Sequence, residues 1–286
     1  MEEKNERGET LKEFLARYDE TKYQRPSNTV DMILLTVLKG KLKVLLVKRK
    51  DHPFIHDWAM PGGFVNFDED LDTAMKRELE EETNLFDSTY FRQLYTFGNA
   101  DRDPRTRVIT TVYLSMTPAE NIKMTSAGDD AMDTGWFTIQ KITTTSDGYE
   151  RKSVLMLDEE EKGIHLRYEI YDTACDNYVQ TRSKLLESSN AKLAADHIKA
   201  INMAIDVVRN RAASTGIMFN LLPKECTLRE IQEVYEAIVN HPVDTGNFRR
   251  DIKKMLVATG STTIVNGRKV ATYSFNPLLP FVKETL

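Results

Sequence analysis

Acidic side chains cluster on one predicted helix of this sequence, between Leu71 and Leu85, and they are the groups best suited to chemistry. Residues three and four apart share a helix face. The stripe on that face is apolar at first and then acidic: Leu71, Ala74, Met75, Glu78 and Glu82, with Glu81 at its edge. A solvated acidic face is the ordinary alternative. Against it, clustered carboxylates repel one another, and these interrupt a stripe that begins as core. Oxygen ligands on one face suit a hard divalent cation, Mg²⁺ or Mn²⁺.

The spacing of these residues resembles the Nudix box. Gly63 is followed after five residues by Glu69 and after seven more by Arg77, which opens the run Arg-Glu-Leu-Glu-Glu-Glu-Thr-Asn-Leu. The family motif has glycine where this chain has Asn84, and asparagine tolerates a positive φ better than most residues. The lead-in Trp-Ala-Met-Pro-Gly-Gly-Phe-Val is also similar to that of the family. The resemblance implies a Nudix α/β/α sandwich with a mixed sheet.

The resemblance also implies an activity. Its substrate would be a nucleoside diphosphate linked to another group, with ADP-ribose the leading candidate. Mg²⁺ or Mn²⁺, held by the box glutamates and by a backbone carbonyl near the two glycines, would acidify the attacking water. Arg77 would orient a glutamate, and Glu69 would support the ligands. The implied metal and catalytic residues are Gly62, Gly63, Glu69, Arg77, Glu78, Glu81 and Glu82.

Two further groups of polar residues follow the box. The motif Asp-Arg-Asp-Pro-Arg at 101–105 is shared by ADP-ribose pyrophosphatases and Nudix-related regulators. Arg102 and Arg105 are therefore candidates for contact with a diphosphate or a terminal ribose, and a surface loop is the alternative. In some relatives the catalytic base lies on a distant loop, which leaves four residues open: Glu120, Asp129, Asp130 and Asp133.

A winged helix is predicted for residues 217–286. Thr227 to Glu230 form a capping-box sequence before a helix that ends at Asn240-His241-Pro242. A second helix, capped by Thr245, Gly246 or Asn247, precedes a hairpin whose Asn266-Gly267 turn favours type I′. Helix, turn, helix and hairpin is the order of a winged helix.

Charge supports a nucleic-acid role for this segment. Between His241 and Phe275 the sequence has six basic residues and two acidic ones, a net charge of +4 in a chain whose total net charge is −5. A winged helix meets DNA with its second helix and its hairpin. A basic face on a dimerisation domain is the alternative. The DNA-binding candidates are Asn247, Arg249, Arg250, Lys253, Lys254, Arg268 and Lys269.

The combination resembles the Nudix-related transcriptional regulators of NAD metabolism, over roughly residues 30–140 and 217–280. Two functions stay open. One is a Mg²⁺-dependent diphosphate hydrolase whose C-terminal domain supports dimerisation. The other is a regulator that binds double-stranded DNA and ADP-ribose or a related metabolite, with little or no hydrolysis. The intact box favours the first function, and the basic helix and hairpin favour the second.

Four segments are predicted in all. Residues 1–26 form a polar arm or helix, 27–145 the Nudix domain, 146–216 a hairpin and a long connecting or dimerisation helix, and 217–286 the winged helix. The long helix is predicted over 190–214. His197 lies on its apolar stripe, and a structural histidine is favoured over a metal ligand because no second ligand pairs with it at helical spacing.

Composition fits a soluble protein. Of the 286 residues, 41% are hydrophobic and 29% are charged, as in globular chains. Two cysteines make a disulfide framework unexpected and favour free thiols in a reducing cytosol. The charged N-terminus lacks the apolar core of a signal peptide, and no apolar run approaches membrane-spanning length. We therefore expect a cytoplasmic protein with no membrane partner, and the predicted long helix suits a homodimer.

Overall fold

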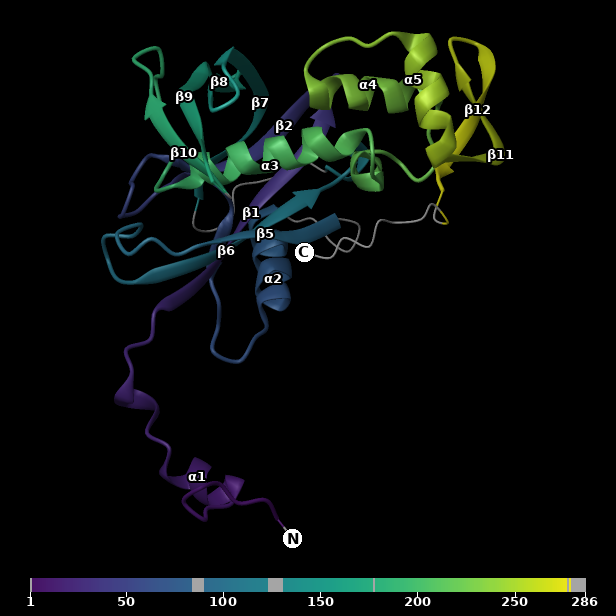
Figure 1. Cartoon of the computed structure of the whole chain (residues 1–286). Helices are drawn as coiled ribbons and strands as arrows, with labels where there is room; N and C mark the ends of the chain where they lie inside the picture. The colour runs from purple at the N-terminus through teal and green to yellow at the C-terminus, as the bar shows by residue number, and fades with distance from the viewer. Residues whose placement is uncertain (1, 84–89, 123–130, 177, 277, 279–286) are drawn as a thin grey trace.

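One mixed sheet forms the centre of the protein. The structure, a computed structural model, describes residues 2–83, 90–122, 131–176, 178–276 and 278. In this part of the chain the ten-stranded sheet has the order β10-β9-β8-β7-β2-β1-β6-β5, with β3 paired to β2 and β4 to β1. β1 and β6 run parallel, and the other pairs are antiparallel. The predicted mixed sheet is confirmed, and Figure 1 shows its strands between the helices.

Ten strands make up this sheet in the described residues. They are β1 (Ser27–Leu38), β2 (Lys41–Arg49), β3 (Trp58–Ala59), β4 (Gly62–Phe64), β5 (Tyr90–Phe97), β6 (Val108–Met116), β7 (Ala131–Ser146), β8 (Glu150–Glu159), β9 (Ile164–Cys175) and β10 (Tyr178–Leu185). The predicted hairpin around residues 158–163 is confirmed as β8 and β9. Residues 51–63 are rich in proline and glycine and would be expected to form a loop, but β3 and the start of β4 lie there.

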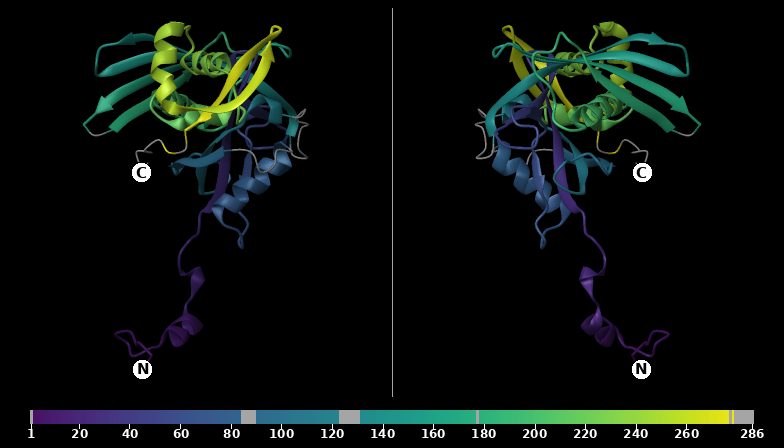
Figure 2. Two further views of the ribbon diagram at one scale, coloured as in Figure 1. Left: turned by 90° about the vertical axis from the view of Figure 1, so that its right-hand side faces the viewer. Right: turned by 90° about the vertical axis from the view of Figure 1, so that its left-hand side faces the viewer.

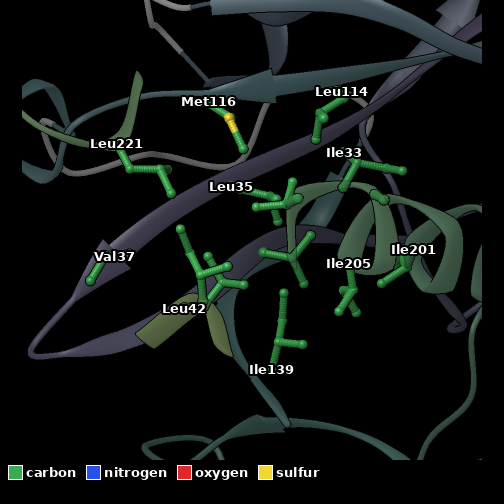
Figure 3. Close-up of a cluster of buried hydrophobic side chains, with 14 of the residues drawn as sticks. Ile33, Leu35, Val37, Leu42, Leu114, Met116, Ile139, Ile201, Ile205 and Leu221 are labelled. Carbon is green, nitrogen blue, oxygen red and sulfur yellow. The ribbon is translucent and has the colours of Figure 1, made fainter. Parts of the chain in front are cut away.

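Two helices cover opposite faces of the sheet at β1. Side chains alternate along a strand, so Val30, Met32 and Leu34 pack with α2 (Leu71–Thr83) in one apolar cluster. Ile33, Leu35 and Val37 pack on the other face with α3 (His197–Ala212). Figure 3 shows Leu35 of β1, Leu42 of β2 and Ile205 of α3 pointing toward one another in this second cluster.

The prediction of a helix from residue 190 was wrong at its start, since α3 begins at His197. The preceding residues instead run beside β3: Trp58 forms an isolated parallel bridge with Leu193, and its amide and carbonyl bond to Lys192 and Ala194. α3 does bridge, as predicted, because its buried side chains contact both the sheet and α4.

The C-terminal elements form the predicted winged helix. They are η3 (Gly216–Leu221), α4 (Leu228–Val239), α5 (Thr245–Ile252), η4 (Lys253–Met255), β11 (Leu256–Val265) and β12 (Arg268–Phe275). The Thr227 capping box is present, and Asn240 ends α4 with a left-handed φ of 62°. Asn266 and Gly267 both have positive φ, as a type I′ turn requires. Asp244 caps α5, not the three residues predicted.

The N-terminal arm stands away from the sheet. It contains α1 (Leu11–Arg17), which has a capping box but no buried residue, and the short helix η1 (Glu20–Lys22). Figure 2 shows the arm on the opposite side of the molecule from the winged helix in both views. One further short helix, η2 (Ala119–Asn121), follows β6. Every helix in the described residues is too short or too polar to cross a membrane.

Candidate functional site

A cavity of about 470 Å³ opens at the ends of β1, β2 and β4. This volume falls in the range of small-molecule sites. Its walls come from α2, from the loop that follows β2, from the loop that precedes β6 and from the residues that lead into α3. The predicted residues among its lining are Gly62, Gly63, Arg77, Glu78, Glu81, Glu82, Arg102 and Arg105.

Arg77 organises the acidic wall. Its guanidinium donates to both carboxylate oxygens of Glu69, at 3.1 and 2.7 Å, and to Glu78 at 2.7 Å and Glu81 at 3.1 Å. A fifth hydrogen bond reaches the carbonyl of Phe64 at 3.0 Å. Arg77 thus connects Glu69, which precedes α2, with the glutamates of α2 and with strand β4. A guanidinium can do this because it carries several N–H donors in one plane.

The two glycines allow α2 to approach β4. A Cβ on Gly63 would lie 2.2 Å from Oε1 of Glu78, so any side chain there would displace this carboxylate. A Cβ on Gly62 would lie 2.2 Å from the carbonyl oxygen of Val30, and Gly62 has a φ of +154°. Glycine is therefore required at both positions, for close packing at Gly63 and for packing and conformation at Gly62.

Burial raises the pKa of a carboxyl group and the guanidinium of Arg77 lowers it, and the balance differs between Glu78 and Glu69. Burial raises the pKa of Glu78, and the hydrogen bond from Arg77 opposes this shift only in part. Arg77, followed by the amide of Asn66, lowers the pKa of Glu69 to about 2. Glu69 is therefore ionised at any ordinary pH, whereas Glu78 takes up a proton more readily than a free glutamate.

The carboxylate oxygens of Glu78, Glu81 and Glu82 line the cavity together with the glycine pair, and oxygen ligands of this kind suit Mg²⁺. Glu81 is exposed and Glu82 is half-buried, and both line the same cavity as the buried Glu78. As placed, the carboxylates do not converge: in the described residues no three His, Cys, Asp or Glu side chains form a metal-binding group. Glu78 and Glu81 both face Arg77, so an ion would have to replace part of that contact.

The two candidate arginines before β6 differ in their surroundings. Arg102 is buried and donates to Asp196 at 2.9 and 3.4 Å, with Asp31 at 3.9 Å. Arg105 is exposed at the rim, donates to Asp103 and lies with its guanidinium carbon 5.4 Å from the ring centre of Phe64. Neither lies on a plain surface loop, because both line the cavity.

Of the open candidates for the base, two can be placed. Glu120 lies on η2 and Asp133 on β7, and neither is among the residues that line the cavity. Asp133 instead accepts from Lys162. Asp129 and Asp130 lie outside the described residues, as does Asn84.

Sequence reasoning missed the far wall of the cavity. His197 does have the structural contact that was expected, since its buried Nδ1 accepts from the amide of Met60 at 2.9 Å. Its ring nevertheless lines the cavity, and Nε2 lies 4.0 Å from Oδ1 of Asp31. Asp31 interrupts the apolar run of β1, and that interruption was the available signal.

The basic residues of the winged helix lie on its surface. All seven candidates are exposed: Asn247, Arg249, Arg250, Lys253, Lys254, Arg268 and Lys269. The prediction that Lys253 and Lys254 belong to the second helix was wrong, because α5 ends at Ile252 and a 3₁₀ turn follows. Figures 1 and 2 both show α5 beside the β11–β12 hairpin. Phe248 anchors α5 on α4 by packing against Tyr235.

Comparison with known proteins covers both parts of the chain. A NUDIX domain model matches residues 26–157, and a model of the NrtR DNA-binding winged helix domain matches residues 218–275. An ADPR responsive transcriptional repressor, NtrR of Acinetobacter baylyi, is 28% identical over 92% of this chain and 87% of its own length.

An ADP-ribose pyrophosphatase of Methanocaldococcus jannaschii is 33% identical over 49% of this chain and 80% of its own length. Among solved structures, Shewanella oneidensis NrtR complexed with a 27mer DNA has a TM-score of 0.58 and 26% identity. That match covers 87% of this chain and 93% of the other. The similarity therefore extends over the sheet and the winged helix together.

Proposed function

Because the chain belongs to the Nudix family and ends in a winged helix of the NrtR type, we propose that it is a Mg²⁺-dependent hydrolase of ADP-ribose that also binds double-stranded DNA. The observation that carries the catalytic part is the wall formed by Arg77, Glu78 and the glycine pair in a cavity large enough for a nucleotide. The matches to a pyrophosphatase and to a repressor support the two parts of the proposal.

In this mechanism the chain supplies the ligands and their orientation. Glu78, Glu81 and Glu82 would hold Mg²⁺, with a carbonyl oxygen from Gly62 or Gly63. When bound, the ion supplies charge neutralisation of the diphosphate and an acidified water.

The other residues of this wall hold the site in shape. Arg77 fixes the Glu78 carboxylate against Gly63, and Glu69 holds the other edge of the guanidinium. Arg105 is the arginine better placed to bind the diphosphate, because its side chain is 45% exposed at the rim, whereas that of Arg102 is 6% exposed.

The winged helix would bind DNA through α5 and the hairpin. Its exposed lysines and arginines suit phosphate contacts, which position a protein on DNA without reading sequence. Asn247, Arg249 and Arg250 lie on α5, the helix that enters the major groove in proteins of this kind. A likeness over the whole chain to an ADPR responsive repressor supports control of this binding by the same ligand.

Hydrolysis is tested by AMP release from ADP-ribose in the presence of Mg²⁺. Glu82→Gln should lower the rate by about two to three orders of magnitude, because it removes a metal ligand and stabilisation of developing charge together. Glu80→Gln is the matched control, since Glu80 is exposed on α2 and does not line the cavity. Equal rates for the parent protein and Glu82→Gln would show that the box glutamates are not catalytic.

A second candidate function is a regulator that binds ADP-ribose with little or no hydrolysis. The separation of the carboxylates favours it, because Glu78 and Glu81 both bond to Arg77 and no group of three metal ligands forms in the described residues. The two candidates are distinguished by measuring turnover and the affinity for DNA duplexes from the neighbouring promoter in the same preparation. A parent protein that does not turn over ADP-ribose, but whose DNA affinity changes when ADP-ribose is added, would support the second.

A further inference from the structure

The N-terminal arm is folded, yet its helix is not covered by the described part of the chain. α1 begins with a complete capping box between Thr10 and Glu13, and Arg17 in its last turn donates to Glu9 at 2.9 Å. None of its residues is buried, and Figures 1 and 2 show the arm standing away from the sheet. α1 has seven residues, and isolated helices shorter than about 12 residues are marginal in water. We therefore expect another surface to stabilise it.

α1 has one apolar face. Its large apolar side chains recur at intervals of three and four residues, which places them on one side of the helix: Leu11, Phe14, Leu15 and Tyr18. Leu11 is 68% exposed, Leu15 59% and Tyr18 55%. Lys12 lies on the opposite side of the helix. Apolar side chains that gather on one exposed side mark an interaction surface.

The exposed area of the chain favours a second copy as the partner. The accessible surface is 17394 Å², whereas a compact monomer of 32.8 kDa exposes roughly 12,500 Å². The difference is several times the area of about 800 Å² that each partner buries in a typical interface. The arm contributes to this excess because it extends into solvent. A second copy, the commonest partner of a soluble chain, can cover it.

The position of the winged helix indicates where that copy would stand. Two winged helices that bind one duplex lie on the same side of a dimer, because both face the DNA. The arm leaves the molecule on the side opposite the winged helix. In a two-fold dimer the two arms then lie together on the side away from the DNA. This step rests on the proposed function, whereas the exposure of α1 does not.

The chain between α1 and β1 is long enough to reach the second copy. Residues 19–26 include η1 and span about 20 Å. Asp19 caps η1, and Arg25 donates to Glu20 at 2.8 Å, so this connection is itself structured and leads away from the sheet. Folding back onto its own sheet would break these contacts, whereas reaching a second copy preserves them.

A matching apolar side chain lies at the same end of the molecule. Phe67, in the loop between β4 and α2, is 94% exposed. Its loop is fixed, because the amide of Asn66 donates to Glu69 at 2.7 Å and Arg77 holds Glu69. Figures 1 and 2 show this loop on the side of the sheet from which the arm leaves. A phenylalanine held in water is stabilised when another molecule covers it, and aromatic side chains are enriched in interfaces.

We propose that two copies of this chain exchange their N-terminal arms, so that the apolar face of α1 in each copy packs beside Phe67 of the other. Neither α1 nor Phe67 lines the cavity, and both lie away from the winged helix. The exchange therefore joins two copies while it leaves the ligand site and the DNA-binding face open.

The first test is photo-crosslinking of the full chain at micromolar concentration. The photoreactive amino acid p-benzoylphenylalanine is placed at Leu15, on the apolar face, or at Lys12, on the opposite face, as the matched control. Irradiation of the Leu15 variant should give a covalent dimer with twice the chain mass on a denaturing gel, attached within residues 64–70. The Lys12 variant should give at least about fivefold less.

The second test is sedimentation of the dimer. Leu11→Gln combined with Leu15→Gln should raise the dissociation constant of the dimer by at least about tenfold, because two apolar side chains leave the contact. Lys12→Gln should change this constant by less than about twofold. Because α1 buries no residue in its own chain, these variants should keep the fold of the parent protein.

The outcomes separate the arm exchange from the proposed function. A Leu15 variant that gives no covalent dimer, crosslinks within its own chain or attaches outside residues 64–70 would overturn the exchange. An unchanged dissociation constant for the double variant would do the same. Neither measurement uses ADP-ribose or DNA. A protein that forms the arm-linked dimer but neither hydrolyses ADP-ribose nor binds DNA would therefore refute the proposed function alone.

Discussion

Replacing Gly63 by alanine tests the catalytic wall with the smallest possible change. The backbone at Gly63 has no positive φ, so alanine is acceptable there in conformation. Its Cβ, however, would lie 2.2 Å from Oε1 and 2.7 Å from Oε2 of Glu78, where ordinary contact begins at 3.4 Å. The carboxylate must therefore withdraw by at least about 1.2 Å, the difference between 3.4 and 2.2 Å.

A displacement of this size should have a large effect on the rate of hydrolysis and a small effect on the stability of the fold. Misplacing a catalytic group by about 1 Å lowers rates by about a hundredfold. Glu78 is held by Arg77 at 2.7 Å, so its movement also disturbs the guanidinium that orients Glu69 and Glu81. We expect Gly63→Ala to lower Mg²⁺-dependent AMP release from ADP-ribose by about two orders of magnitude. ADP binding in EDTA should change much less.

The matched control is Gly98→Ala. A Cβ on Gly98 would have its nearest neighbours, in Arg107 and Ile109, at 3.9 Å, which is ordinary contact. Thermal melting of both variants separates a local effect from loss of the fold. If Gly63→Ala folds normally and hydrolyses ADP-ribose within about threefold of the parent rate, a carboxylate at this exact position is not needed for catalysis. The assignment of Glu78 would then be refuted.

Three further predictions concern the buried glutamate, the basic face of α5 and the contact between α3 and α4. First, the folded-state pKa of Glu78 is raised by burial, so its protonated form favours folding below the unfolded pKa and this contribution is lost as pH rises through the folded pKa. The stability of Glu78→Gln relative to the parent protein, measured by urea unfolding, should therefore increase from about pH 4 to pH 7, and a constant difference would contradict this. Second, Arg249→Ala or Arg250→Ala should reduce the slope of log affinity for DNA against log salt by about 1 each. Lys184→Ala on β10 should leave the slope unchanged. Third, Arg209→Met removes hydrogen bonds to the carbonyls of Ile238 and Lys141, and it should reduce the effect of ADP-ribose on DNA affinity. An undiminished effect would exclude this contact from the coupling.

The parts that the sequence predicted correctly carry local signals. The helix from Leu71 has apolar spacing, the helix from Leu228 has a capping box, and the Asn266-Gly267 turn has residues that accept positive φ. Each signal lies within a few residues of the structure that it predicts. For the same reason the helix that carries the box glutamates and the winged helix could be predicted without knowledge of the sheet.

The inner end of the cavity carries no such signal. Asp31 and Arg102 are 71 residues apart, and Arg102 and His197 are 95 apart. They meet only because β1 lies between β4 and β6 and because the chain before α3 runs beside β3. Periodicity even placed His197 in the core, which is correct for its burial but does not reveal the cavity on its other side. The late start of α3 has the same origin: pairing with Trp58 overrides helix propensity in residues 192–194.

α3 is the element through which a ligand can act on DNA binding. Its first residue, His197, lines the cavity, and Arg209 in its last turn donates to the carbonyl of Ile238 in α4 of the winged helix. The helix has 16 residues, about 24 Å at 1.5 Å each, and Ile201, Ile205 and Val208 between its ends are fully buried. A packed helix shifts as a unit, because close-packed cores do not absorb small displacements locally.

A ligand changes an equilibrium only if it binds the two states with different affinity. A ligand in the cavity meets this condition if α3 takes a second position, because the 4.0 Å separation between Asp31 and His197 is fixed on one side by β1 and on the other by α3. Arg102 also makes the shape of the cavity depend on the position of α3. It lines the cavity and bonds to Asp196, the residue immediately before α3. The winged helix would then respond to a ligand that contacts His197, so ADP-ribose should alter the affinity for DNA.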